Sequence, residues 1–347
     1  MRASRLLLVP FVAFAAACTQ KPETDAELIA RAGAPLFAGM GEFHRVITTK
    51  DAGAQRYFDQ GMVLAFGFNH AESIRSFRAA QKLDPDCAMC FWGEALATGP
   101  NINVTAKGKA IMSTDEQTAA WAALEKAKAV SASKPEVERD LIEALGKRYS
   151  ETPVEDRTAF DIAYAGALGE LVTKYADDDY IAAMYGEAWM NTMPWNYWSD
   201  ATTPRPEIAP VIAALEKTIA RSPKHPLALH LYIHAMEASA APEKAEAASD
   251  TLLTLVPGSG HLVHMPAHIY YRVGRYNDSV QANIAAAKVD EDYIAQCNAQ
   301  GFYPAMYYPH NIHHLWSSAS MQGQGKLAIE TARKLADNVS LAQIDQF

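Results

Sequence analysis

The feature that most constrains the fold is a helical period that takes over at Gly53. No stretch shows the two-residue alternation typical of β-strands. Between residues 54 and 87, small and aromatic residues recur where two antiparallel helices would touch, and a proline stands where the second helix would end. These residues are Tyr57, Gly61, Ser73, Phe77, Ala80 and Pro85. The sequence therefore predicts an all-α fold.

These six residues fall at positions 4, 8, 20, 24, 27 and 32 of a 34-residue unit. The tetratricopeptide pattern has an aromatic residue, glycine, a small residue, phenylalanine, alanine and proline there. The chain thus resembles the tetratricopeptide-repeat (TPR) family, best over 54–87 and 260–293. The resemblance implies a right-handed superhelix of about seven helical hairpins, with long inter-helix loops at 99–113, 191–206 and 290–305.

The helical pattern continues through the rest of the chain. It predicts helices over 87–98, 114–130, 135–149, 156–176, 180–191, 207–221, 225–238, 242–255, 305–320 and 326–338, and a hairpin over 261–289. With its His-Met-Pro-x-His-Ile-Tyr and Tyr-Pro-His-Asn sequences, the chain resembles bacterial TPR proteins that have no established activity. The resemblance therefore says little about chemistry.

The first seventeen residues have the features of an export signal. Arg2 and Arg5 precede an apolar run that is too short to span a bilayer. The run ends at Ala15-Ala16-Ala17-Cys18, which resembles a bacterial lipoprotein signal with Cys18 as the lipidated residue; ordinary cleavage with Cys18 incidental is the alternative. Thr19 after the cysteine favours, by the same resemblance, the outer over the inner membrane. We predict a signal peptide at 1–17, a tether and lead-in at 18–50, and a repeat domain at 51–347.

Composition restricts the partners of the exported chain. Removal of two arginines leaves 29 basic and 40 acidic residues, a formal charge of −11. This acidic balance argues against nucleic acid and against docking on anionic lipid. We therefore expect a periplasm-facing protein held to the membrane by the lipid on Cys18, with a protein or small-molecule partner in its groove.

Histidines form the main functional signal. Nine of the eleven lie between residues 225 and 314. They include three pairs spaced i,i+4, which places each pair on one helix face. The first two pairs are 34 residues apart, and the third follows after 46. The candidate metal ligands are the three pairs and His261, namely His230, His234, His261, His264, His268, His310 and His314.

The TPR resemblance implies that these histidines line the concave groove, at positions 2, 5 and 9 of their repeats. Imidazoles from adjacent helices would then converge within reach of a metal, and histidine is the commonest ligand of copper and zinc. Pro266 is expected to kink the helix between His264 and His268. The alternative is that duplicated repeats copied one histidine pair, which makes a polar groove or ordinary hydrogen-bonded side chains.

Other residues are candidates for the same groove. Glu187 is the best carboxylate for a catalytic base. An aromatic loop at 194–198 either covers the groove or fills a gap between hairpins. The predicted groove-lining residues are Asn101, Trp195, Tyr197, Trp198, Tyr270 and Tyr308.

The cysteines beyond Cys18 are few. Cys87 and Cys90 form a CxxC pair. This pair favours a local disulfide or two packed thiols over a redox pair or half of a zinc site. Cys297 is expected to be a buried thiol.

Three functions follow from these features. The favoured one is an exported binding or scaffold protein that holds copper or zinc, or a metal-dependent small ligand, in a histidine-lined groove. The others are a metal-dependent enzyme on the same histidines and a metal-free protein-interaction scaffold. The chain has no GxGxxG, P-loop, GxSxG or HExxH motif, so common nucleotide-binding and hydrolytic chemistries lack support.

Overall fold

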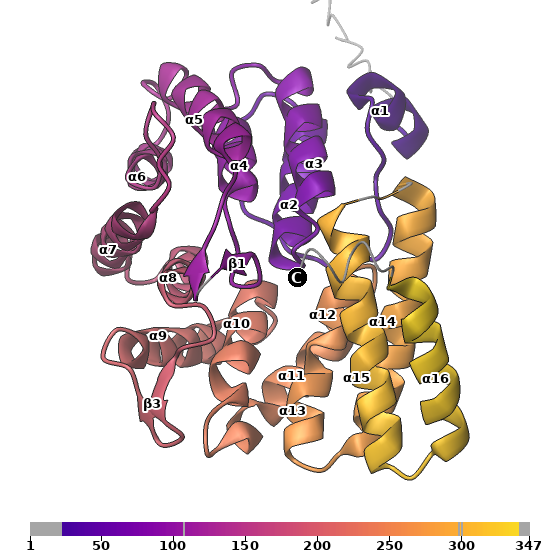
Figure 1. Cartoon of the computed structure of the whole chain (residues 1–347). Coiled ribbons are helices and arrows are strands. Elements are labelled where there is room, and N and C mark those ends of the chain that lie inside the picture. The colour runs from indigo at the N-terminus through magenta and orange to yellow at the C-terminus, as the bar shows by residue number, and fades with distance from the viewer. Residues whose placement is uncertain (1–22, 107, 298, 300, 340–347) are drawn as a thin grey trace, which may run out of the picture.

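A computed structural model describes residues 23–106, 108–297, 299 and 301–339 (Figure 1). The predicted signal peptide and Cys18 lie outside this part of the chain. Within it, no helix is both long enough and apolar enough to cross a membrane. The described residues are mainly helical, which confirms the all-α prediction.

The first half of the chain contains eight helices in the described residues. They are α1 (Asp25–Ala32), α2 (Ala52–Phe66), α3 (His70–Leu83), α4 (Ala88–Thr98), α5 (Thr114–Ala129), α6 (Glu136–Gly146), α7 (Thr158–Lys174) and α8 (Asp179–Thr192). The α1 helix belongs to the predicted lead-in, and its Leu28 is buried in the core.

The second half contains the helices that carry most of the histidines. They are α9 (Ile208–Arg221), α10 (Pro226–Glu237), a 3-10 turn (Pro242–Ala245), α11 (Glu246–Leu255), α12 (Gly260–His264), α13 (Pro266–Arg272), α14 (Tyr276–Cys297), a π-helical turn (Tyr303–Tyr307), α15 (Tyr308–Met321) and α16 (Gly325–Asn338).

Two of the predicted long loops contain short antiparallel hairpins. Strands β1 (Thr105–Ala106) and β2 (Lys109–Ala110) pair in the first, and β3 (Trp198–Asp200) and β4 (Thr203–Pro204) pair in the second. The third, at 290–305, was predicted wrongly as a loop over its first half, since α14 continues to Cys297. Asp290 is buried on that extension, where it accepts a hydrogen bond from Tyr303 Oη at 2.8 Å.

Successive helices pack side by side around an arc that brings the two halves of the chain close together (Figure 1). Small residues stand at the close contacts, as predicted. A Cβ atom on Gly61 of α2 or Gly93 of α4 would lie 2.9 Å or 2.3 Å from the ring of Phe77, which α3 places between them. The lead-in segment contacts the second half of the chain, because Gly258 N, between α11 and α12, donates to Gly39 O at 2.8 Å.

Candidate metal centre

Seven histidines from three neighbouring parts of the arc meet in one place. Each of them is buried or nearly so. Side chains from α12, α13 and α15 form the four-His cluster: His264, His268, His310 and His314. Side chains from α10 and α12 form the three-His cluster: His230, His234 and His261. Within each cluster, one nitrogen from every ring lies within 4.8 Å of all the others, so each cluster can hold a metal ion.

The helix ends place these side chains. His225 caps α10 with its ring, accepting from Ala228 N at 3.3 Å, and Pro226 follows at the first helical position, where its missing N–H costs nothing. Pro266 divides the next helix into α12 and α13, as the sequence predicted. The division leaves His264 and His268 facing the same point, because Met265 keeps helical angles of φ −49° and ψ −40°.

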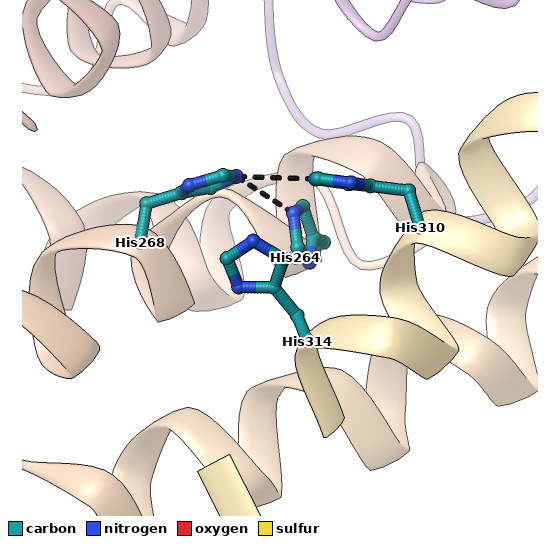
Figure 2. Close-up of side chains that lie close together, drawn as sticks. All are labelled: His264, His268, His310 and His314. Carbon is teal, nitrogen blue, oxygen red and sulfur yellow. Dashed lines mark hydrogen bonds between the residues drawn. The ribbon is translucent and has the colours of Figure 1, made fainter. Parts of the chain in front are cut away.

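The four-His cluster closes around a small central space (Figure 2). His268 Nε2 lies 2.9 Å from His264 Nε2 and 3.5 Å from His310 Nε2. The ring of His314 completes the group, with its centroid 4.3 Å from that of His268. A tetrahedral ion with metal–nitrogen distances of about 2.0–2.1 Å sets its nitrogens roughly 3.3 Å apart. The two observed Nε2–Nε2 separations, 2.9 Å and 3.5 Å, lie on either side of this expected spacing.

Hydrogen bonds fix which nitrogen of His264 and His268 carries the proton. His264 Nδ1 lies 2.6 Å from Asn283 Oδ1, and the Asn283 amide nitrogen donates to Ser279 O at 2.8 Å. The Asn283 oxygen therefore accepts, and His264 Nδ1 donates. His268 Nδ1 likewise donates to Glu237 Oε1 at 2.7 Å.

Glu237 is an acceptor because it is ionised. Burial raises the pKa of Glu237, but the hydrogen bond from His268, together with the charge of that ring when it is protonated, outweighs burial and holds this pKa below its usual range. In neutral imidazoles, the Nε2 atoms of His264 and His268 then direct two lone pairs at each other across 2.9 Å. That arrangement is repulsive, and either a metal ion or a proton between the two nitrogens removes the repulsion.

The three-His cluster has the same spacing with fewer polar neighbours. His261 Nε2 and His230 Nε2 lie 3.2 Å apart. Neither ring nitrogen of His234 has a hydrogen-bond partner in the described part of the chain, although the residue is only 2% exposed. An unpaired buried polar atom costs about 1–3 kcal/mol. A bound cation would supply the missing partner.

Burial favours the neutral form of the imidazoles of His230, His234, His261, His264 and His310. It lowers the pKa of His230 and His310 to about 3. Burial, reinforced by neighbouring histidines, also holds the pKa of His234, His261 and His264 well below the usual value. A neutral imidazole has a free lone pair, which is the form that binds metals.

Aromatic rings surround the three-His cluster. Phe68 lies with its ring centroid 4.9 Å from those of His230 and His261, and Trp195 lies edge-on at 5.0 Å from His234. Phe68 and Trp195, with φ of 59° and 63°, are the non-glycine residues with positive φ in the described chain. Such backbone conformations cost about 1–2 kcal/mol each. Phe68 lies near all three histidines of this cluster and Trp195 lies against His234, and strain of this kind concentrates at functional sites.

The other predicted site residues divide between the cluster and the surrounding structure. Asn101 reaches the cluster indirectly, because its Oδ1 accepts from Tyr307 Oη at 3.3 Å and the Tyr307 ring lies 5.0 Å from that of His261. Trp198 donates from Nε1 to Ala235 O at 2.7 Å and so ties β3 to α10.

Four predicted residues make their contacts elsewhere. Tyr197 is buried in the core. Tyr270 donates to Asp250 at 2.8 Å, and Tyr308 donates to Glu291 at 2.9 Å. Glu187 is partly buried and accepts from Asn191 at 3.2 Å. Burial raises the pKa of Glu187, which belongs to neither histidine cluster.

Sequence reasoning missed the residues that support the histidines. Glu237 carried a weak signal, because it stands three residues after His234 on the same helix. Asn283, Phe68 and Tyr307 carried none, since they come from other helices and turns. Tyr307 ends a π-helical turn, a rare conformation that is frequent at functional sites.

The cysteines take structural positions. Cys87 and Cys90 form a disulfide at the start of α4. A local disulfide was one of the two alternatives that the sequence favoured. Cys297 is a half-buried thiol, and burial raises its pKa to about 12, which makes it a poor nucleophile.

Comparison with protein-family models finds no match, and comparison with curated protein sequences finds none either. The TPR resemblance therefore stays a prediction from the sequence. The functional argument rests on the geometry of the two clusters.

Proposed function

We propose that this chain is an exported, lipid-anchored binding protein of the TPR type whose groove holds copper or zinc through its seven clustered histidines. The observation that carries the proposal is the 2.9 Å approach of His264 Nε2 and His268 Nε2, whose Nδ1 atoms are already hydrogen-bonded to Asn283 and Glu237. The fixed tautomers leave a cation as the group that relieves this contact.

The carboxylate and amide partners of the histidines support a metal over a shared proton. Ligating histidines commonly donate their second N–H to a carboxylate or a carbonyl oxygen, which orients the ring and raises its basicity. Glu237 and Asn283 have this relation to His268 and His264. The low pKa of His230 and His310 also disfavours protonation of the centre.

Charge favours copper over zinc. Among the described residues, Glu237 is the carboxylate paired with one of the seven histidines, His268. Two zinc ions would bring four positive charges into this buried site, and burial of uncompensated charge is costly. Reduced copper carries a single charge and accepts imidazole ligands. The Cys87–Cys90 disulfide is consistent with export to an oxidising compartment.

The test is the metal content of the chain, produced from Thr19 behind a cleavable non-lipoprotein signal and measured by elemental mass spectrometry. We expect up to two copper or zinc ions per chain, reduced in a His264→Gln/His268→Gln variant. The exposed His313 of α15 provides the control, because His313→Gln changes a histidine of the same region outside both clusters. A folded chain that takes up neither metal would overturn the proposal.

A further inference from the structure

A cavity of about 230 Å³ lies directly against both histidine clusters. It touches His234 and His261 of the three-His cluster and His268 and His310 of the four-His cluster. The other lining residues are Asn103, Trp195, Phe302, Met306 and Tyr307. A molecule in this cavity would therefore contact both metal sites.

The walls of the cavity suit a flat apolar ring. Trp195 and Phe302 are 47% and 38% exposed, although both are large aromatic residues, and they stand at this cavity from separate loops. Exposed aromatic side chains gathered at one cavity mark a binding site more often than an ordinary surface. An aromatic guest would stack on these rings and on Tyr307.

The size of the cavity limits the guest. An apolar cavity of about 150 Å³ is enough to hold benzene. The volume here accommodates one aromatic ring with a small substituent, whereas a peptide ligand would need a longer groove.

The three-His cluster at the floor of the cavity has room for one further donor atom. The two nitrogens of His234 are buried without a protein partner, and three protein ligands leave the fourth position of a tetrahedral ion open. The four-His cluster fills all four positions with protein nitrogens. The three-His cluster is thus the site with room for an external ligand.

We propose that the three-His site binds a small aromatic molecule with one oxygen donor, of the phenol class, in the cavity beneath Trp195. The ring lies between Trp195, Phe302 and Tyr307, and the oxygen, which releases its proton to solvent, would coordinate the metal held by His230, His234 and His261. This inference rests on the proposed metal binding and deepens it by naming the ligand class.

Because reduced copper is silent in both measurements, the copper-loaded chain is first oxidised to copper(II) and then titrated with phenol, followed by the oxygen-to-copper charge-transfer band and by electron paramagnetic resonance. Copper content is measured first in every variant. Cyclohexanol serves as the non-aromatic control of similar size, and azide reports whether the copper has an open position.

We expect saturable phenol binding that weakens about fivefold in Trp195→Ala and is largely restored in Trp195→Phe. Trp316→Ala is the matched control, because Trp316 is a 39% exposed tryptophan that does not line this cavity. It should leave phenol binding unchanged, and cyclohexanol should not compete.

The outcomes separate the two proposals. A chain that takes up no copper overturns the proposed function, and this inference with it. A chain that holds copper and responds to azide but not to phenol, or that binds phenol equally well in Trp195→Ala, overturns this inference alone. Competition by cyclohexanol at the same concentration overturns the aromatic class.

Discussion

The two histidine clusters are made of the same residue type on neighbouring helices, yet their surroundings differ. In the four-His cluster, polar side chains of Glu237 and Asn283 fix the ring orientations. In the three-His cluster, the aromatic rings of Phe68, Trp195 and Tyr307 pack against the histidines. Ligand number follows the same division, with four against three. The comparison indicates that, in the proposed function, the four-His cluster would surround its ion with protein ligands, whereas the three-His cluster would leave one position for a ligand from the cavity.

The strongest way to break this comparison is to empty the four-His cluster. His310→Gln/His314→Gln removes two of its ligands from α15, where both side chains are only partly buried and a folded protein is expected. We predict the loss of about one ion per chain, with the other retained. Elemental mass spectrometry measures the content, and circular dichroism checks folding. Loss of both ions, or of none, would contradict two separate sites.

Glu237→Gln tests whether the carboxylate behind His268 contributes to metal affinity. Removal of such a partner typically weakens binding 10–100-fold. We predict a decrease of this order at the four-His site and none at the three-His site, measured by competition with a chelator. Glu243→Gln, at an exposed position after α10, is the control. Equal weakening of both sites would mean that the clusters do not act independently.

Acid sensitivity should be a property that the two clusters share. The folded pKa of His230 and of His310 is about 3, below the unfolded value of about 6.5. The stability that each histidine contributes is present above pH 6.5 and is lost as pH falls toward 3, at up to ~1.4 kcal/mol per pH unit. The metal-free chain should therefore lose stability between pH 6.5 and 5.

Denaturant unfolding of the metal-free chain at several pH values measures this loss. His230→Gln and His310→Gln should each make the pH dependence shallower by a similar amount. If only one of them does so, the two clusters differ in burial more than their geometry indicates.

The smallest expected effect on the metal sites comes from Asp290, which packs against Gly260 just ahead of His261. Burial raises the pKa of Asp290 to about 7, so its contribution to stability is present below pH 4 and is lost as pH rises toward 7. We predict that Asp290→Asn stabilises the chain by up to ~4 kcal/mol at pH 8 relative to pH 4 and leaves metal content unchanged. Denaturant unfolding at the two pH values measures the first, and a change in metal content would show that Asp290 also positions α12.

The sequence predicted the helices closely where the pattern was local. The helix at 207–221 appears as α9, and that at 114–130 as α5, because amphipathic spacing and helix caps are set by neighbours in the chain. The extension of α14 was missed because Asp290 and its acidic neighbours resemble a solvated helix end. Its burial depends on Gly260 and Tyr303, which lie elsewhere in the sequence.

The sequence predicted which histidines form the candidate site, but not how they divide into two clusters. All seven histidines were identified from their i,i+4 spacing and the repeat register. The sequence left open whether they converge, because that depends on how successive helices are rotated. His261 of α12 joins His230 and His234 of α10, while its neighbour His264 belongs to the other cluster. The aromatic supports, such as Phe68, come from turns far away in the sequence and had no recognisable pattern.

The most direct test of the central claim is anomalous X-ray diffraction from crystals of the chain loaded with copper, with data collected on both sides of the copper edge. The account predicts two anomalous peaks, one surrounded by His264, His268, His310 and His314 and the other by His230, His234 and His261. A single peak shared by the two groups would contradict the division into two sites. A map without a peak at either cluster would contradict metal binding itself.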